Sequence, residues 1–125
     1  MRALGLLPAG YVFIVSVKLS SLVSILSTQF EFRVAIAKDS DPYKATIKAL
    51  NLVYDDFTVN HDDRIVIKPN IVRPVPPEEG ITTDARVVEA IIEHLKGRGV
   101  DDIVIAEGGN PGTDKALKKL GFKDL

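Results

Sequence analysis

Apolar residues recur with a period of two near residue 32 and with a helical period after residue 41. Phe32, Val34 and Ile36 alternate, with the small residues Ala35 and Ala37 between them, and the run ends at Lys38. This alternation predicts the first strand of a domain.

A helix follows that strand. Asp41 and Pro42 are typical of an N-cap and a first helical position. The predicted buried face has the spacing i, i+4, i+7 and i+11: Tyr43, Ile47, Leu50 and Tyr54.

Two further strand–helix pairs follow. The runs 64–68 and 102–106 are short, apolar and bounded by breakers, which predicts buried strands. Asp84 is the expected N-cap of the second helix, which ends at Gly97, and Thr113 or Asp114 is the expected cap of a third helix that ends at Gly121. The buried stripe of the second helix comprises Val87, Val88, Ile91, Ile92 and Leu95.

The element order β-α-β-α-β-α predicts an α/β fold with a Rossmann-like parallel sheet and flanking helices. Three strands are few for a sheet that is buried on both faces. The chain ends at Leu125, where a fourth strand is expected, so the predicted α/β domain, residues 31–125, is partial.

Residues 1–30 form an apolar N-terminal segment whose only charged residues are Arg2 and Lys18. Three interpretations stay open: a targeting segment of the signal-peptide type, a strand with period two from Tyr11 to Ser20, or sequence that is not native to the domain. Pro8 and Gly10 interrupt the apolar run, and no A-x-A cleavage site follows it.

Composition narrows the function classes. The chain has 125 residues, a net charge of −1 and no cysteine. Without a basic stripe, we expect no nucleic-acid partner. The absence of cysteine excludes disulfides and cysteine-ligated iron–sulfur clusters in this chain. We expect a soluble, cytoplasmic protein, and the sequence names no cofactor.

The strings V-I-K-P-N-I-V, T-T-D, R-V-V-E-A-I-I-E-H-L-K and D-I-V-I-A-E-G resemble the uncharacterised domain-of-unknown-function 362 family. The resemblance covers roughly residues 32–125 and implies the N-terminal part of a longer α/β domain. Many family members carry cysteine-rich, ferredoxin-like segments, and that association does not transfer to this chain. The resemblance implies no reaction.

The candidate chemistry lies at the carboxyl ends of the predicted strands, where open α/β sheets bind ligands. Lys68 is a point charge for phosphate or carboxylate, or a nucleophile if it is enclosed in an apolar pocket; the alternative is a strand-end lysine in water. Asn70 is suited to hold a ligand or its own turn. Glu107 is a candidate general base, so Lys68 and Glu107 are the two candidate catalytic residues.

Thirteen residues, 71–83, connect the second strand to its helix, more than the two to six that are typical. Four prolines lie in or beside this loop and stiffen it, namely Pro69, Pro74, Pro76 and Pro77. It is suited to a ligand wall or to a contact with another chain. Thr82 and Thr83 precede the helix and are expected to contact a ligand, whereas Asp84 is expected to cap.

The glycine-rich turn after the third strand supplies two more candidate ligand-binding residues, Gly108 and Gly109. The turn fits neither common phosphate-binding motif. No metal site is expected, and His61 and His94 are expected to be solvated.

These residues support two hypotheses. In the first, the domain binds an anionic small molecule at the strand ends, with or without turnover. In the second, it is a non-catalytic module that pairs through an open sheet edge and the Pro-rich loop with a partner chain or a second copy.

Overall fold

The structure is a computed structural model that describes the chain outside residues 1–2, 7–10, 21–28, 55–57 and 109–111. Its first part is an antiparallel sheet in the order β1-β2-β3, with β1 at Ala3–Leu6, β2 at Tyr11–Ser20 and β3 at Gln29–Lys38. The register pairs Tyr11 with Lys38 and Ser20 with Gln29. Of the three interpretations of the N-terminal segment, the strand from Tyr11 to Ser20 is the one that the fold contains.

The second part is a parallel pair, β4 at Ile65–Ile67 and β5 at Ile103–Ile105, with Val66 opposite Val104. Helix α1 spans Pro42–Leu52, α2 spans Ala85–Lys96 and α3 spans Thr113–Lys119. Short 3-10 turns lie at Pro77–Glu79 (η2) and Phe122–Asp124 (η3). The α/β class is as predicted, and the parallel strands with their helices are consistent with a Rossmann-like fold.

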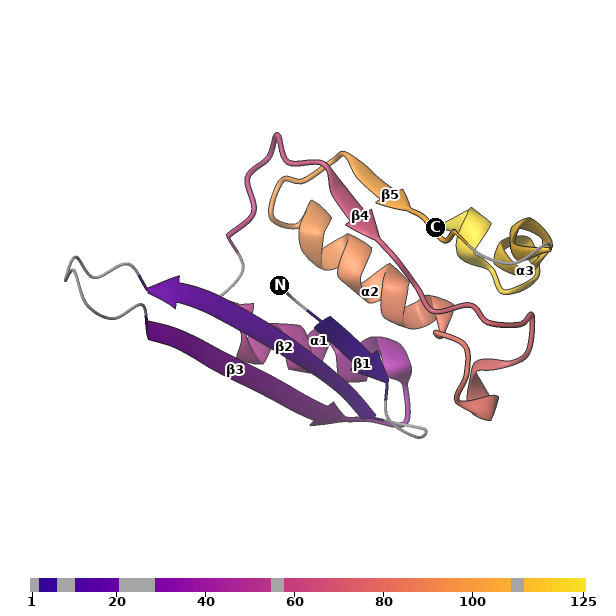
Figure 1. Ribbon diagram of the computed structural model, residues 1–125, viewed down its shortest axis with the longest axis horizontal. Helices are drawn as coiled ribbons and strands as arrows, with labels where there is room; N and C mark the ends of the chain where they lie inside the picture. Colours follow the sequence, from indigo (N-terminus) through magenta and orange to yellow (C-terminus); the bar gives the residue numbers. More distant parts are fainter. Residues whose placement is uncertain (1–2, 7–10, 21–28, 55–57, 109–111) are drawn as a thin grey trace.

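The two sheets lie at opposite sides of a helical layer (Figure 1). Helix α1 packs on the β2–β3 ribbon, α2 packs beside α1, and the β4–β5 pair lies beyond α2. The described part of the chain contains no helix that is long and apolar enough to cross a membrane.

The placement of β3 differs from the prediction. The run at 32–38 is a strand, but it pairs antiparallel with β2 and not parallel with β4. A ten-residue ladder with β2 pairs the backbone groups on one edge of β3 along its whole length, which no three-residue parallel partner can do. The prediction that β3 joins the other two strands in one parallel sheet was therefore wrong.

The buried face of α1 also differs from the prediction. The helix begins as expected, with the Asp41 carboxylate accepting a hydrogen bond from the Tyr43 N–H. Its buried residues are Ala45, Thr46, Ala49 and Leu50, whereas Tyr54 is 47% exposed. Small alanines on α1 meet Ala35 and Ala37 of β3, so the helix lies close to the sheet and the larger side chains move to the flank.

Helix α2 is central to the packing, and its predicted stripe is confirmed. Val87 joins the cluster with α1 and β3, and the half-buried Ile91 packs against that cluster. Val88 and Ile92 join a second cluster that includes Ala116 and Phe122 of the C-terminal part. Adjacent residues of α2 thus serve two separate cores, one on each side of the helix.

The caps were predicted with mixed success. Asp84 caps α2, its carboxylate accepting a hydrogen bond from the Arg86 N–H. The cap of α3 is Gly112, with φ of 103°, and neither Thr113 nor Asp114. Glycine adopts this left-handed conformation without the steric cost of a Cβ atom, so it starts the helix in place of a side-chain cap.

Candidate functional site

Parallel pairing of β4 and β5 brings two predicted site residues together. Lys68 follows β4 directly, Glu107 lies two residues after β5, and Lys68 Nζ is 2.7 Å from Glu107 Oε2. The Lys68 side chain is 65% exposed, whereas the Glu107 side chain is 8% exposed. The strand ends therefore place a nearly buried carboxylate beneath a cation that extends into solvent.

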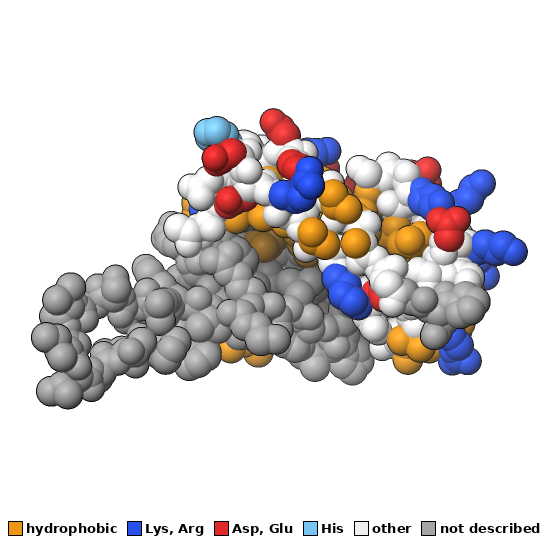
Figure 2. Space-filling model, turned by 45° about the horizontal axis from the view of Figure 1, so that its top comes forward, with side chains coloured by type: hydrophobic (Ala, Val, Ile, Leu, Met, Phe, Trp, Pro, Cys, Tyr) orange, Lys and Arg blue, Asp and Glu red, His pale blue; other side chains and the backbone are white. Residues whose placement is uncertain are grey.

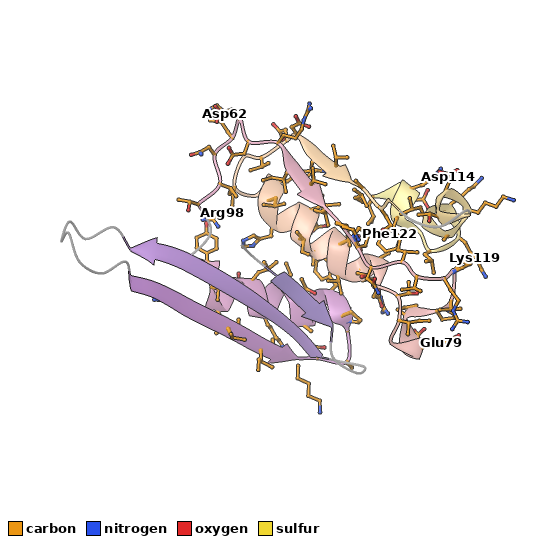
Figure 3. The ribbon with its side chains drawn as sticks, in the orientation of Figure 1. Asp62, Glu79, Arg98, Asp114, Lys119 and Phe122 are labelled. Atoms are coloured by element: carbon orange, nitrogen blue, oxygen red, sulfur yellow. The ribbon has the colours of Figure 1, made fainter. Side chains whose placement is uncertain are left out.

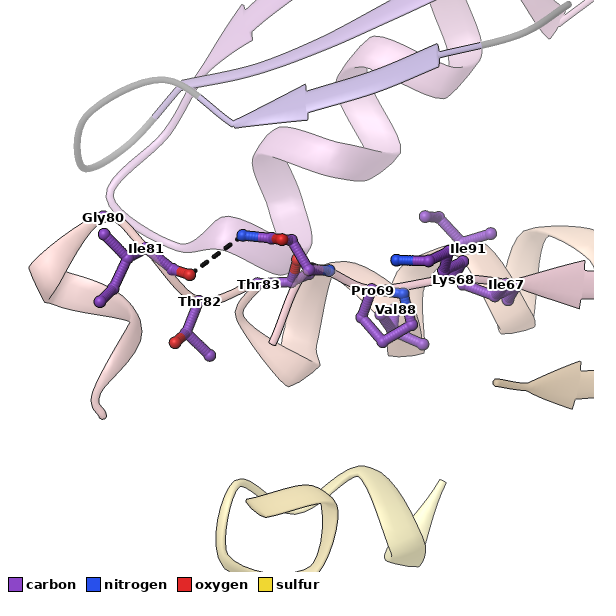
Figure 4. A pocket seen from close by; sticks show the side chains of 10 residues that line it. Ile67, Lys68, Pro69, Gly80, Ile81, Thr82, Thr83, Val88 and Ile91 are labelled. Carbon is purple, nitrogen blue, oxygen red and sulfur yellow. Dashed lines mark hydrogen bonds between the residues drawn. The ribbon is translucent and has the colours of Figure 1, made fainter. Parts of the chain in front are cut away.

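Asn70 and Thr83 clamp the two ends of the long loop. The Asn70 N–H donates to Thr83 Oγ1 over 2.9 Å, and the Thr83 N–H donates to the Asn70 carbonyl over 2.8 Å. The Asn70 side chain adds a third bond, from Nδ2 to the Ile81 carbonyl over 3.0 Å (Figure 4). Both predicted roles of Asn70 are thus compatible, because the side chain holds the turn with one N–H and retains its amide oxygen and a second N–H.

The loop between these ends is ordered by further contacts. Ile71 and Thr82 form an antiparallel bridge, and Thr82 Oγ1 donates to the Arg73 carbonyl over 3.1 Å. Lys119 of α3, labelled in Figure 3, donates from Nζ to the Pro74 carbonyl over 3.2 Å. The loop is therefore attached both to its own base and to the C-terminal helix.

The N-terminus of α2 is occupied by protein groups. The Asp84 side chain is 10% exposed and caps the helix. It also forms a bidentate ion pair with Arg86, in which Nε is 3.0 Å from Oδ1 and Nη2 is 2.7 Å from Oδ2. The carboxylate raises the pKa of Arg86, mainly through this hydrogen bond. The predicted capping role of Asp84 is confirmed, and its negative charge disfavours an anion directly at this helix end.

A cavity of about 220 Å³ lies between the end of β4, the base of the loop and the first turns of α2. It is a place where the two hydrophobic cores meet, because Val88 belongs to one cluster and Ile91 packs against the other. The lining residues, drawn in Figure 4, are Ile67, Lys68, Pro69, Asn70, Gly80, Ile81, Thr82, Thr83, Val88 and Ile91.

Four of the predicted site residues line this cavity: Lys68, Asn70, Thr82 and Thr83. Glu107 reaches the cavity only through its contact with Lys68. Gly108 is exposed and does not line the cavity, and Gly109 lies outside the described residues. Within the described ranges, no group of three acidic or histidine side chains gathers to hold a metal ion.

The apolar wall of the cavity was not predicted. Ile67, Val88 and Ile91 were assigned to the core alone, and Ile81 was treated as part of the loop. The signal was the position of Ile67 at the end of β4 and of Val88 in the first turn of α2, since such residues lie next to the strand-end crevice. The contact between Lys68 and Glu107 follows from the same geometry, because each lies just after one of two adjacent parallel strands.

The histidine prediction was half right. His61 has a side chain that is 85% exposed, as expected. His94 is instead half-buried, and its ring meets the Tyr54 ring edge-on at 5.6 Å between centroids. Arg98, labelled in Figure 3, lies over the same tyrosine ring at 4.3 Å.

A family model described as Domain of unknown function (DUF362) matches residues 65–125. The match confirms the predicted resemblance over this part of the chain. The match begins at the first residue of β4 and takes in the whole loop, α2, β5 and α3, so every candidate residue of the site lies within the DUF362 segment. The chain matches none of the curated proteins and none of the solved structures compared with it.

The match corrects the predicted extent of the resemblance. The resemblance was expected to cover this chain from about residue 32 onward, as the N-terminal part of the family's domain, whereas the match begins at residue 65 and occupies the C-terminal part of the chain. The motifs that carried the resemblance all lie at or after Val66. The strand and helix before them, β3 and α1, have patterns that many α/β proteins share, so they added length to the prediction without specificity.

Proposed function

We propose that this DUF362 segment binds a small anionic molecule in the cavity at the carboxyl end of β4. The observation that carries the proposal is the position of Lys68, whose exposed side chain lines the cavity beside Asn70 and Thr83. An ammonium group is a compact point charge for carboxylate or phosphate. The Thr83 hydroxyl accepts from the Asn70 N–H and keeps its own hydrogen to donate to a ligand.

The two candidate catalytic residues differ in their suitability for turnover. A nucleophilic lysine needs an apolar enclosure, and Lys68 is 65% exposed and ion-paired, which favours a binding role. Glu107 is nearly buried and is the better candidate for accepting a proton. We therefore assign binding to Lys68 and leave acid–base chemistry to Glu107 in any reaction at this site.

Thermal unfolding of the full chain with inorganic phosphate and with small carboxylates tests the binding proposal. A ligand at 100 times its Kd stabilises the folded state by about 2.7 kcal/mol, which raises the melting temperature. We expect Lys68→Ala to lose this shift. Lys123→Ala is the matched control, because Lys123 Nζ is also 2.7 Å from a carboxylate, that of Asp114, but does not line the cavity. A Lys68→Ala protein that responds as the wild type does would refute the proposal.

A second candidate function is pairing with a partner chain or a second copy. Among the described residues, β4 pairs only with β5, so each strand has an edge without a strand partner. Val66 and Val104 are 59% and 43% exposed on the outer face of this pair, and Figure 2 shows hydrophobic side chains at the molecular surface among charged ones. Open strand edges and an uncovered parallel sheet favour association.

Light scattering over a range of protein concentrations tests this second candidate. Association of copies through β4 and β5 predicts a mass above 13.6 kDa that Val66→Lys lowers to the monomer value. Val34→Lys changes a residue of equal exposure on β3, so it serves as the control for a general surface effect. A monomer at every concentration would argue against self-association.

A further inference from the structure

Lys68 at the cavity has an opposite charge beside it, the carboxylate of Glu107, which borders the cavity through Lys68. Lys68 lines the cavity, and its Nζ lies 2.7 Å from Glu107 Oε2. Only 8% of the Glu107 side chain is exposed, so water solvates this carboxylate poorly and the lysine is its charged partner. Any ligand that binds Lys68 therefore changes the surroundings of Glu107.

A ligand with a negative charge alone fits this pair badly. It competes with Glu107 for the ammonium group and leaves a nearly buried carboxylate with a weaker partner. Loss of the partner of a buried charge is strongly unfavourable. A ligand that carries a hydrogen-bond donor beside its negative charge satisfies both residues. Its negative group binds the Lys68 ammonium, and its donor replaces the hydrogen bond that Glu107 loses from Lys68.

The rest of the cavity restricts the ligand further. Ile67, Val88 and Ile91 contribute apolar surface next to Lys68, which an inorganic ion would leave uncovered. Asn70 and Thr83 contribute an amide and a hydroxyl on the loop side. The volume of about 220 Å³ lies below the 300–1,000 Å³ of drug-sized sites, so the ligand is small.

We propose that the ligand is a short carboxylate with a hydroxyl or amino group on the adjacent carbon, and this inference rests on the proposed function. Its carboxylate pairs with Lys68, its hydroxyl or amino group donates to Glu107, and its short apolar side chain contacts Ile67, Val88 and Ile91. Glu107 is thus a residue that determines specificity at this site.

Calorimetric titration of the full chain with butyrate, 2-hydroxybutyrate and 2-aminobutyrate tests the proposal. The three compounds share a carbon skeleton and differ in the substituent beside the carboxylate: a hydrogen, a hydroxyl or, at neutral pH, a charged ammonium group. Because a hydrogen bond to a charged group is strong, we expect the two substituted acids to bind at least about tenfold more tightly than butyrate. Lys68→Ala weakens binding of all three.

Glu107→Gln keeps the shape of the side chain and removes its charge, so the preference for 2-aminobutyrate over butyrate should fall at least about tenfold. Asp114→Asn is the matched control and keeps the wild-type preference, because its partner Lys123 does not line the cavity, whereas Lys68, the partner of Glu107, does. The ratio measured with wild-type protein decides the question even if the Glu107 variant does not fold.

The outcomes separate the two proposals. Equal binding of butyrate and the substituted acids by the wild type overturns the specificity inference and leaves the anion site standing. Binding of inorganic phosphate alone also overturns the inference, since the apolar surface is then unused. No binding of phosphate or of any of the three acids overturns the proposed function as well.

Discussion

Asp39, which directly follows β3, has a clearly altered proton affinity. Lys48 Nζ lies 2.6 Å from its Oδ2, and the Asp41 N–H donates to its Oδ1 over 3.0 Å. These contacts, with the Lys48 hydrogen bond the largest cause, lower the pKa of Asp39 from 3.8 to about 2. Because the folded-state pKa is lowered, the resulting stability is present above the unfolded value and is lost as the pH falls towards 2.

Carbon-13 NMR of the Asp39 carboxyl group measures this directly. We expect its midpoint near pH 2 in the wild type and higher, towards 3.8, in Lys48→Met, where the Asp41 N–H still lowers the pKa. Lys44→Met should move the midpoint less, because Lys44 acts on Asp39 only through its charge. An unchanged midpoint in Lys48→Met would show that the backbone hydrogen bond dominates.

The half-buried His94 predicts a pH dependence of stability in a different range. Burial, and then the charge of Arg98, lower its pKa below 6.5. The unfolded chain therefore takes up a proton at a higher pH than the folded chain does. Stability from this group is complete above about pH 6.5 and falls as the pH decreases through the interval between the two pKa values.

His94→Gln removes the titrating group, so its melting temperature should change less between pH 7 and pH 5.5 than that of the wild type. His61→Gln is the control, because the His61 side chain is 85% exposed, and it should follow the wild-type curve. Parallel curves for His94→Gln and the wild type would contradict the assignment.

At the scale of elements, α2 depends on its N-cap. Asp84 accepts the Arg86 N–H over 2.9 Å and is almost buried. Asp84→Ala removes this acceptor and should lower the free energy of unfolding by about 1 kcal/mol or more, as for other N-caps. Asp84→Asn keeps a cap acceptor but loses the charge that pairs with Arg86, so urea denaturation should place it between Asp84→Ala and the wild type.

Elements were predictable from the sequence where the pattern is local. The stripe of α2, the Asp84 cap and the apolar strands β4 and β5 each depend on neighbours within a few residues. The strand that pairs with β3 was not predictable in this way, because the alternation of Val34 and Ile36 with alanines suits a parallel or an antiparallel neighbour equally. The buried face of α1 follows from that choice, since Ala45 and Ala49 are buried only because Ala35 and Ala37 allow close approach.

For the site, as for the elements, only the features that depend on nearby residues were predictable from the sequence. Lys68, Asn70, Thr82 and Thr83 are adjacent in sequence to strand and helix ends, so their convergence follows from the fold class. The Asn70–Thr83 clamp and the apolar wall depend on how the loop closes, which no local pattern encodes.

At the scale of the whole molecule, the C-terminal part holds the second core together. Phe122 in η3 is 4% exposed and packs in the cluster that includes Val88 and Ile92 of α2. Phe122→Ala should cost about 3–5 kcal/mol, typical of a buried phenylalanine. Leu125→Ala, at a residue that is 38% exposed, should cost little, and the two values are compared by urea denaturation. A small cost for Phe122→Ala would mean that α3 and η3 contribute little to the second core.

The clamp between Asn70 and Thr83 has a consequence for how this protein can diversify. Three hydrogen bonds close the loop at its base, next to the cavity, and the intervening residues lie beyond that closure. Because closing a longer loop costs little additional entropy, the segment from Val75 to Glu79, which does not line the cavity, can vary in length and composition while the cavity base keeps its shape. Evolution, or a protein engineer grafting a new recognition sequence, can therefore alter the tip of the loop beside the site without rebuilding its charged centre.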